Sequence, residues 1–586
     1  MAEDRLDDLL RRLAQSGARV LPLHGSQVEV LESPDQFYQL LLHSLATAQR
    51  HISIASLYFG TGGGREQEFV DALAAAAHDT AARPQLQIRL LLDALRSTRP
   101  TKGAAVPGGA EGSSGSGTSS GTSSSDGSAA AQLTSTAEML AVHLLEGQQQ
   151  QQQQEADGSG QQEPRVAVSL FHTPALRGLL KRVLPPRVSE IIGVQHMKCF
   201  VFDDTVVLSG ANISSTYLST RQDRYIVIRS APQLASLLRQ LPDAQLPWSG
   251  LRTAPWLVRS SGSGGGSSGS DPSSSSRGWV AAMPSWGGSA AAWSGGSSNS
   301  GASALVQLAS PYLNLARPLE RFLSRRAGSL ELELVTAAPE ANGFFGSKGV
   351  SGMIPLAYSL LEQRTWRRLT RQQRRLAWRQ AWEQPRDRDS SGSAWGPLAA
   401  GAGPAPVEAA SPEAVSSWPP GAGTAEAPAG WPPGAGTTGA LLPGSGRRLF
   451  EFCRPGWEYH AKGIWVSLPA AEAGSSGGSG STSSSGAAPM PPPAGSTSSG
   501  DSGRWAAPAV TSVGSSNYGW RSLRRDLELN FLVVTRNPQL QQALGREVEL
   551  LKSHCQEVLG DAHFRAPGRR ATAAARLAVR LLRGFL

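Results

Sequence analysis

The segment His196-Met-Lys-Cys-Phe-Val-Phe-Asp203 follows the pattern H-x-K-x4-D, which sets two basic side chains and one acid at fixed spacing. The apolar residues between the lysine and the aspartate predict that this segment forms a β-strand. Asn212 follows His196 by 16 residues, in the small-residue sequence Ser-Gly-Ala-Asn. A histidine, a lysine and an asparagine therefore lie within one short stretch of the chain.

A second copy of this pattern occurs far downstream. His460 and Lys462 repeat the H-x-K spacing, and Asn517 follows His460 by 57 residues. A 40-residue low-complexity stretch, 470–509, interrupts that interval. Without it the interval is 17 residues, within one residue of the first copy. The match indicates a divergent internal repeat.

The two copies also continue in similar ways. Arg221 and Asp223 follow the first asparagine, and Arg525 and Asp526 follow the second. An apolar stretch that predicts a strand comes next in both copies. We therefore predict two related lobes, whose histidines, lysines and asparagines face each other in one pseudo-symmetric site. In this prediction Asp223 and Asp526 are counterparts that order the loops after the asparagines.

This set of side chains suits exchange at a phosphate ester. The reaction needs a nucleophile and a proton donor on opposite sides of phosphorus, and two histidines supply both. The non-bridging oxygens carry negative charge, to which two lysines and two asparagines can donate hydrogen bonds from fixed positions. We expect no metal and no other cofactor. A single H-x-K in a strand more often holds a structural histidine, so the prediction depends on the duplication.

The composition excludes several other classes of protein. The 586 residues carry 55 Lys and Arg against 46 Asp and Glu, which gives a net charge of +9 and a pI near 9.8. Three widely spaced cysteines form neither a disulfide framework nor a CxxC metal pair. No apolar run reaches about 18 residues, so we expect no transmembrane helix. The N-terminal residues lack an apolar signal core and are rich in acids, which disfavours a secretory or transit peptide.

Five stretches rich in Gly, Ser, Pro or Gln interrupt the globular sequence, at 101–132, 147–163, 260–303, 385–447 and 470–509. Their composition cannot bury a core, so we expect long disordered inserts on the surface. The remaining 390 residues suffice for two lobes. We place the lobes at 1–259 and 304–586, with 260–303 as the linker.

Residues 27–96 alternate between strand-like and helix-like stretches, which predicts an α/β fold with a mostly parallel sheet and helices on both faces. Ser33 followed by Pro34 predicts the start of a helix. An apolar, strand-like stretch then ends at Gly60-Thr61-Gly62. A glycine turn between a strand and a helix can hold a phosphate or a nucleotide, or can be a tight turn and no more. Both interpretations remain open from the sequence.

The duplicated pattern resembles the two H-x-K-x4-D motifs of the phospholipase D superfamily. Longer stretches are similar to the eukaryotic phosphatidylglycerophosphate synthases, which are CDP-diacylglycerol–glycerol-3-phosphate 3-phosphatidyltransferases. These stretches are ASLYFGTG (55–62), VSLFHTP (168–174), RQDRY (221–225), TAAPEANG (336–343), GWEYHAKG (456–463) and GWRSLRRDLE (519–528). The resemblance covers essentially all of the sequence outside the inserts. It implies two phospholipase D-like α/β lobes, each with a mixed sheet flanked by helices, related by a pseudo-twofold axis.

The resemblance also implies a two-step transfer through a covalent intermediate. His196 would attack the phosphatidyl phosphorus of CDP-diacylglycerol and release CMP. Glycerol 3-phosphate would then attack the phosphatidyl-histidine and form phosphatidylglycerophosphate, the first step of phosphatidylglycerol and cardiolipin synthesis. His460 would move the protons, and Asp203 would support the first half of the site. The opposite assignment, with His460 as the nucleophile and His196 moving the protons, remains open.

We expect the phosphate oxygens to be held by five residues: Lys198, Lys462, Asn212, Asn517 and Ser515. The second motif departs from the superfamily, because Ser467 stands where an aspartate is usual. The similar eukaryotic enzymes also lack that acid, so we do not interpret the site as inactive. The departure makes the two halves unequal.

A lipid substrate implies contact with an anionic membrane surface and peripheral association, and we expect no nucleic-acid partner. Residues 363–384 and 569–586 combine arginines with Trp or Leu, which is typical of interfacial helices on anionic lipid. Solvated basic helices on a soluble domain are an equal alternative. The resemblance suggests the mitochondrial inner membrane, with plastid or endoplasmic reticulum as the other possibilities.

Two other functional classes remain open at this point. A hydrolase of the same superfamily, either a phospholipase D or a nuclease, would use the same residues with water as the acceptor, and the basic charge would suit DNA. A catalytically silent lipid-binding relative is the third hypothesis, motivated by Ser467 alone. The long similar stretches favour the transferase over both.

Overall fold

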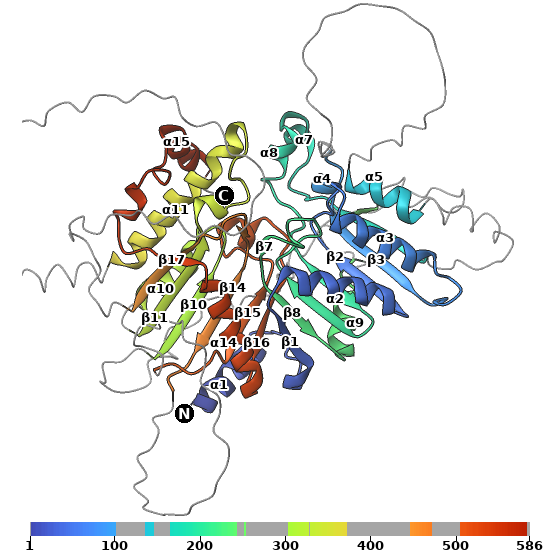
Figure 1. Ribbon diagram of the computed structural model, residues 1–586, viewed down its shortest axis with the longest axis horizontal. Helices are drawn as coiled ribbons and strands as arrows, with labels where there is room; N and C mark the ends of the chain where they lie inside the picture. Colours follow the sequence, from blue (N-terminus) through green and yellow to red (C-terminus); the bar gives the residue numbers. More distant parts are fainter. Residues whose placement is uncertain are drawn as a thin grey trace, which may run out of the picture.

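The computed structural model describes residues 2–100, 135–145, 164–242, 251–253, 303–326, 329–371, 446–470 and 504–582. These residues form two mixed β-sheets side by side, with helices packed against them (Figure 1). A short two-stranded sheet joins the lobes, because β7 (Arg221–Gln222) of the first runs parallel to β13 (Glu458–Tyr459) of the second. The predicted α/β fold with two lobes is confirmed.

The two sheets repeat one topology. The first runs in the order β1 (Val28–Leu31), β8 (Tyr225–Ile228), β6 (Thr205–Ser209), β5 (Cys199–Phe202), β2 (His51–Ala55), β3 (Gln87–Asp93), β4 (Val166–Phe171) and β9 (Leu251–Thr253). The second runs in the order β16 (Asn530–Val534), β15 (Val510–Gly514), β14 (Gly463–Ser467), β10 (Ala304–Ala309), β11 (Leu330–Ala337), β12 (Arg447–Phe452) and β17 (Cys555–Glu557). The strands that follow the two H-x-K patterns, β5 and β14, occupy equivalent positions, as the internal repeat predicts.

The sheets are mixed, so the expectation of a mostly parallel sheet was wrong. Among the described strands, parallel pairing within the two large sheets is confined to β2-β3-β4 and β10-β11-β12. The meanders β5-β6-β8 and β14-β15-β16 pair antiparallel. A two-residue turn joins β5 to β6, and such a short connection permits only antiparallel pairing. Of the strands within 27–96, β2 and β3 pair in parallel, whereas β1 pairs antiparallel with β8.

Helices cover both sheets. The described α-helices are α1 (Ala2–Gln15), α2 (Pro34–Thr47), α3 (Arg65–His78), α4 (Ala94–Ser97), α5 (Thr136–Leu140), α7 (Gly178–Val183), α8 (Pro186–Ser189), α9 (Pro232–Arg239), α10 (Arg317–Arg325), α11 (Ile354–Leu369), α13 (Trp520–Arg524), α14 (Pro538–Lys552) and α15 (Ala573–Leu582). The start of α2 is as predicted, because Ser33 Oγ accepts a hydrogen bond from the Gln36 amide at 3.1 Å. Phe37, Leu41 and Leu45 then recur every four residues and bury one face of α2 on the first sheet.

The two basic segments, 363–384 and 569–586, contain residues that pack in the interior of the second lobe. Trp366 on α11 is 1% exposed and packs in the core of the second lobe, so it is not available to a membrane. On α15, Val579 packs against Ala357 and Leu361 of α11, while Leu577 is 57% exposed. The remaining parts of these segments, 372–384 and 583–586, lie outside the described residues. None of the helices in the described ranges combines the length and the hydropathy needed to cross a bilayer.

Most of the predicted inserts also lie outside the described residues, but two of their boundaries are corrected. Arg447 begins β12 and is 1% exposed, with its guanidinium donating to the carbonyls of Leu323 and Leu369 at 2.7 Å each. Trp505 donates from Nε1 to Glu331 at 2.9 Å. Residues 446–447 and 504–509 therefore belong to the folded second lobe. Each of these two stretches contains a side chain, Arg447 or Trp505, whose hydrogen-bond partners are distant in sequence. Composition does not reveal such partners.

A buried arginine fastens the two lobes together. Arg224, at the entrance to β8, is 1% exposed and donates to both carboxylate oxygens of Glu547 on α14 at 2.7 Å. Its guanidinium also donates to the Ser512 carbonyl and lies 3.9 Å from the ring centroid of Trp465. The four groups thus connect the first sheet to β14, β15 and α14 of the second lobe.

We predict that Arg224→Ala lowers the free energy of unfolding by about 3–5 kcal/mol, because it leaves the Glu547 carboxylate buried without its cation. Urea denaturation followed by circular dichroism measures this change. Arg229→Ala is the matched control, since Arg229 pairs with Glu29 at the surface, where both side chains are about half exposed. That change should cost less than about 1 kcal/mol. Equal losses in the two variants would show that the buried pair does not hold the lobes.

Asp203 closes the turn between β5 and β6, at the far end of the strand from Lys198. Its Oδ1 accepts from the amides of Arg50 and His51 and its Oδ2 from the amide of Gln49, each at 2.8 Å. Burial alone would raise the pKa of this carboxyl, but the three N–H donors lower it below its ordinary value. The residue has φ 49°, a conformation that Asp and Asn tolerate better than other side chains. Asp203 therefore holds the start of β2, and its predicted catalytic role was wrong.

We predict that Asp203→Asn lowers the free energy of unfolding by about 1–3 kcal/mol near neutral pH, because one amide oxygen cannot satisfy three N–H donors. The folded-state pKa is depressed, so the wild-type advantage exists above the unfolded pKa of about 3.9 and disappears as pH falls through the folded value. Urea titrations near neutral pH and below about pH 3 test both parts. Ser467→Ala, at the equivalent position of β14, is the control and should change stability by less than about 0.5 kcal/mol. A loss of turnover in folded Asp203→Asn protein would contradict the structural role.

Candidate active site

The two H-x-K segments meet where the lobes touch. The amide of His460 donates to the Gln222 carbonyl of the first lobe at 2.8 Å, as a continuation of the β7-β13 pairing. The amide of His196 donates to the Leu527 carbonyl of the second lobe at 2.9 Å. Each histidine is therefore held by the backbone of the opposite lobe. This exchange brings together the groups that the internal repeat predicts to face each other.

Each histidine is also paired with a carboxylate of the opposite lobe. His196 Nδ1 lies 3.0 Å from Glu528 Oε2, and His460 Nδ1 lies 2.6 Å from Asp223 Oδ2. Ser515, predicted to bind phosphate, donates its hydroxyl to Glu528 and so holds that carboxylate in place. The carboxylates are 332 and 237 residues from their histidines along the chain. Both of these histidine–acid pairs therefore span the boundary between the lobes.

Glu528 is the functional candidate that the sequence analysis missed. Asp526, the predicted counterpart of Asp223, instead accepts from the Val194 amide at 3.1 Å and pairs with Arg521 at 2.8 Å. A usable signal was present, because Asp223 follows Asn212 by 11 residues and Glu528 follows its asparagine by the same interval. Asp526 follows an arginine, as Asp223 does two residues after Arg221, and this similarity favoured Asp526 over Glu528.

The two lysines have equivalent positions. Lys198 Nζ and Lys462 Nζ each donate at 2.7 Å to the carbonyl of their own motif's histidine, and both side chains are 1% exposed. Lys462 Nζ also lies 2.7 Å from His460 Nδ1. Gly210 sits against this cluster, where a Cβ would come within 2.7 Å of Asp223 and 3.1 Å of Lys462 Nζ. A side chain at position 210 would thus displace the groups that surround His460.

The predicted asparagines each lie three residues past the end of a strand, Asn212 after β6 and Asn517 after β15. Asn212 is 2% exposed, and its Oδ1 is buried without a hydrogen-bond partner among the described residues. The same is true of Oδ1 of Asn517. Buried amide oxygens are normally satisfied, so two unsatisfied ones at equivalent positions are consistent with a ligand that the asparagines would contact. Their amide groups carry both donors and acceptors.

The surroundings of the two histidines differ. Tyr217 Oη lies 3.2 Å from His460 Nε2, and the two rings meet edge to face. Arg221 covers the other side of Tyr217 at 3.9 Å from its centroid and pairs with Glu458 of the second lobe. His196 Nε2 has no hydrogen-bond partner within the described ranges, and its side chain is 14% exposed against 7% for His460. The His196 imidazole is the more accessible of the two.

Burial governs the protonation of these groups. It lowers the pKa of Lys198 to about 7 and that of Lys462 to about 8. It also lowers the pKa of both imidazoles, well below the ordinary value for His460, where the nearby Lys462 acts in the same direction. Burial opposes ionisation of Glu528, but the charge and hydrogen bond of His196 lower the pKa of that carboxyl overall. Burial raises the pKa of the Asp223 carboxyl, although the charge of Lys462 opposes that rise. Neutral imidazoles are therefore the favoured state of both histidines near neutral pH.

The glycine turn is not a free anion site. Glu66 at the start of α3 is 4% exposed and accepts from the Gly62 amide at 3.3 Å and from the Ser215 hydroxyl. A Cβ at Gly60 would come within 2.8 Å of the same carboxylate. The chain's own acid therefore occupies the place where a phosphate would bind, and the interpretation of Gly60-Thr61-Gly62 as a phosphate or nucleotide loop was wrong. The turn packs a strand end against α3.

Comparisons with known proteins agree with this arrangement. No family model matches the chain. The mitochondrial CDP-diacylglycerol–glycerol-3-phosphate 3-phosphatidyltransferase of Gallus gallus is 27% identical, over 96% of this chain and 84% of that protein. The Homo sapiens protein of the same name is 26% identical over 96% and 83%, and the Saccharomyces pastorianus transferase is 23% identical over 91% and 83%.

A solved structure shares the fold. The phosphatidylserine synthase of Haemophilus influenzae superposes with a TM-score of 0.53 at 15% identity, over 99% of this chain and 97% of that one. At this identity the likeness concerns the fold alone. The sequence relatives match nearly the whole length of the chain, and they come from vertebrates, a slime mould and a yeast. Over that length the chain is thus similar to the eukaryotic proteins named CDP-diacylglycerol–glycerol-3-phosphate 3-phosphatidyltransferase.

Proposed function

We propose that this protein transfers the phosphatidyl group of CDP-diacylglycerol to glycerol 3-phosphate, releasing CMP and forming phosphatidylglycerophosphate. The names of its relatives support this reaction over almost the full chain. The observation that carries the mechanism is the crossed pairing of His196 with Glu528 and of His460 with Asp223. It provides two imidazoles of fixed orientation, each in the same motif as a buried lysine, where the two lobes touch.

We assign the nucleophile to His196. Glu528 accepts a hydrogen bond from Nδ1–H, which fixes the tautomer that leaves the lone pair on Nε2. A bond forms between Nε2 and phosphorus while the bond from phosphorus to the CMP oxygen breaks. The ring of the phosphatidyl-histidine carries positive charge, which the Glu528 carboxylate stabilises. The accessibility of Nε2 in His196, where His460 Nε2 is covered by Tyr217, favours this assignment over the exchanged one.

His460 is proposed as the general base of the second step. Its depressed pKa keeps the ring neutral, so it can accept the proton of the glycerol 3-phosphate hydroxyl as that oxygen attacks phosphorus. The bond between phosphorus and Nε2 of His196 breaks as the new bond forms, and the His196 imidazole is released as the leaving group. Asp223 on Nδ1 then stabilises the imidazolium that forms. CMP needs little help to leave in the first step, since its phosphate is a weak base. The two histidines thus act in sequence.

The lysines and asparagines are proposed to hold the phosphate. Burial lowers the pKa of Lys198 to about 7 and that of Lys462 to about 8. An incoming phosphate would favour the ammonium forms, which donate to its non-bridging oxygens. Asn212 and Asn517 would add amide donors from the ends of equivalent strands. Since the charge on these oxygens redistributes during transfer, fixed donors stabilise the transition state.

We further propose peripheral association with the mitochondrial inner membrane. Relatives are named mitochondrial, which supports the organelle. On the protein, α7 exposes Leu179 by 77% and Val183 by 67%, with Lys181 and Arg182 beside them. Apolar and basic side chains on one short helix suit the interface of an anionic bilayer. Residues of this kind give contact with a lipid substrate without a spanning helix.

The proposed reaction is tested with purified protein, CDP-diacylglycerol labelled in the phosphatidyl phosphate, and glycerol 3-phosphate, serine or water as the acceptor. We expect product with glycerol 3-phosphate only. His196→Ala should form neither product nor labelled protein, because the covalent step is lost. His460→Ala should lose most of its transfer but accumulate labelled protein, because CMP leaves without the base. Labelled product from folded His196→Ala would remove the proposed nucleophile, and hydrolysis with every acceptor would favour the hydrolase.

We predict that Glu528→Gln lowers kcat by about 10²–10⁴-fold, because the amide keeps the shape but no longer fixes the tautomer or stabilises the positive ring. Its melting temperature should stay close to that of the wild type. Steady-state kinetics with a parallel thermal melt make this measurement. Asp526→Asn is the control and should retain turnover, since Asp526 contacts the backbone of Val194 and the side chain of Arg521 rather than a histidine. A greater loss of kcat in Asp526→Asn than in Glu528→Gln would indicate that Asp526, rather than Glu528, supports His196.

A further inference from the structure

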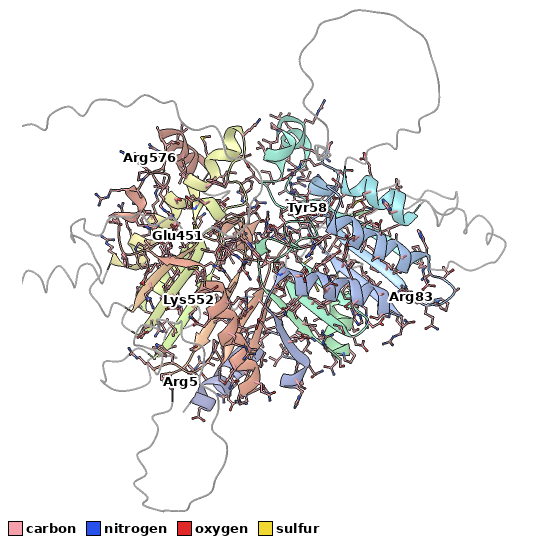
Figure 2. The ribbon with its side chains drawn as sticks, in the orientation of Figure 1. Arg5, Tyr58, Arg83, Glu451, Lys552 and Arg576 are labelled. Carbon is pink, nitrogen blue, oxygen red and sulfur yellow. The ribbon has the colours of Figure 1, made fainter. Side chains whose placement is uncertain are left out.

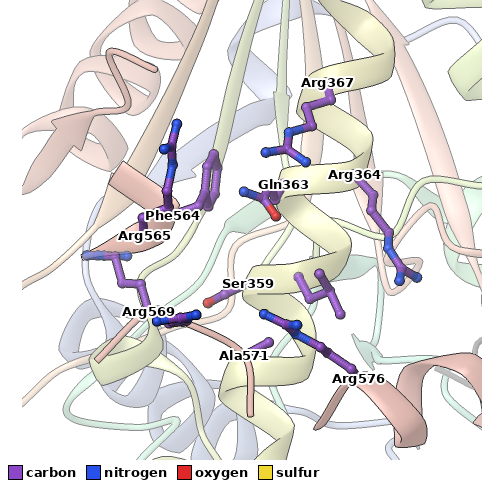
Figure 3. Close-up of a pocket in the computed structure, with 11 residues that line it drawn as sticks. Ser359, Gln363, Arg364, Arg367, Phe564, Arg565, Arg569, Ala571 and Arg576 are labelled. Carbon is purple, nitrogen blue, oxygen red and sulfur yellow. The ribbon is translucent and has the colours of Figure 1, made fainter. Parts of the chain in front are cut away.

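The second lobe contains an arginine-lined cavity of about 640 Å³ apart from the site described above. It lies between α11 and the segment that contains a 3-10 turn (His563–Arg565) and the start of α15. Figure 3 shows the arginines of α11 and those of this segment around a common hollow. Six of the eleven lining residues are arginines: Arg364, Arg367, Arg565, Arg569, Arg570 and Arg576. None of the eleven belongs to the histidine, lysine, asparagine or carboxylate set of the active site.

The acids near this cavity neutralise only part of its charge. Arg569 pairs with Glu451 and lies 3.9 Å from Glu340, and Arg367 pairs with Asp561 at 3.1 Å. In the part of the chain that the structure describes, the other four arginines have no acidic partner. Glu451 and Arg576 both lie on the second-lobe side of the molecule, to the left in Figure 2. A hollow with this excess of guanidinium groups attracts anions.

Apolar side chains border the same hollow. Leu360 and Phe564 contribute to its lining. Leu577 follows Arg576 by one residue and is 57% exposed on α15. The helix is anchored by Val579 against α11, so its exposed leucine has a fixed place on the same helix that contributes Arg576 to the lining. Positive charge within and an apolar side chain at the edge match the two ends of a phospholipid.

We propose that this cavity binds the phosphate head group of an anionic phospholipid of the bilayer, as a docking site separate from the catalytic centre. Guanidinium groups donate two parallel hydrogen bonds to phosphate oxygens, which makes arginine the suitable residue. The volume suits a head group, since ligand sites commonly enclose about 300–1,000 Å³. Acyl chains would then pass over Leu577 into the membrane. The inference goes beyond the proposed reaction and does not depend on it.

Sedimentation with phosphatidylcholine vesicles, with and without phosphatidylglycerol, tests this proposal on the full-length protein. Arg565→Ala/Arg570→Ala removes two lining arginines that are exposed and have no acidic partner, so the fold should persist. Affinity for the anionic vesicles should fall by at least about tenfold, since each arginine near the surface contributes about fivefold. Arg321→Ala/Arg546→Ala is the matched control, because it removes the same charge from exposed positions on α10 and α14 outside the cavity. We expect less than about a threefold loss there.

Two further measurements are needed. The first distinguishes a lipid head group from a small phosphate anion, and the second distinguishes the cavity from the proposed active site. Inorganic phosphate or glycerol 3-phosphate at millimolar concentration should leave the vesicle affinity of the wild type unchanged; displacement of the vesicles by either would indicate a site for small anions and overturn the proposal. Equal losses in the two double variants, or no loss in Arg565→Ala/Arg570→Ala, would overturn it as well. With detergent-dispersed CDP-diacylglycerol, the cavity variant should keep wild-type turnover. Loss of that turnover would overturn the separation from the active site, while vesicle binding remains measurable even if the proposed reaction is wrong.

Discussion

The crossed hydrogen bonds between each histidine and the carboxylate of the opposite lobe are the constraint on which the active centre depends. His196 reaches Glu528 and His460 reaches Asp223, so each lobe completes the other's site. Buried charges of this kind are stable only when they are paired and hydrogen-bonded. The lobes must therefore keep one relative position, and the β7-β13 pairing together with the Arg224–Glu547 contact holds that position. The contacts between the lobes and the pairing of the histidines therefore require the same fixed arrangement of the two lobes.

The repeat has diverged in ways that suit two different tasks. Asp203 ties β5 to the start of β2, whereas Ser467 stands at the same point of β14, far from the reacting groups. The acid missing from the second motif therefore concerns the packing of a turn rather than catalysis. Around the imidazoles, Tyr217 covers His460 and leaves His196 accessible. A common fold thus presents one histidine for attack and keeps the other for proton transfer.

The excess positive charge of the chain is not spread evenly. Part of it is used within the fold, where Arg224 and Arg447 are buried and satisfy carboxylates or carbonyls. Another part gathers at the arginine cavity between α11 and α15, where acids compensate only two of the six guanidinium groups. Because the proposed substrate resides in a membrane, an anion site with an apolar rim would hold the protein at the surface from which it draws CDP-diacylglycerol. Such a site is independent of the chemistry at the histidines.

The sequence by itself determined the repeat, the strands that carry it and the identity of the two histidines, lysines and asparagines, because these depend on short spacings and local periodicity. The start of α2 at Ser33 was predictable for the same reason. Only the tertiary structure decided which acids serve the histidines, since Glu528 and Asp223 reach them across the lobe boundary and nothing local separates Glu528 from Asp526. It also moved Asp203 from the site to a turn, filled the glycine turn with Glu66, buried Trp366, and gathered arginines from two distant segments around one hollow. Each of these outcomes depends on which side chains meet in space, and a pattern along the chain does not specify that.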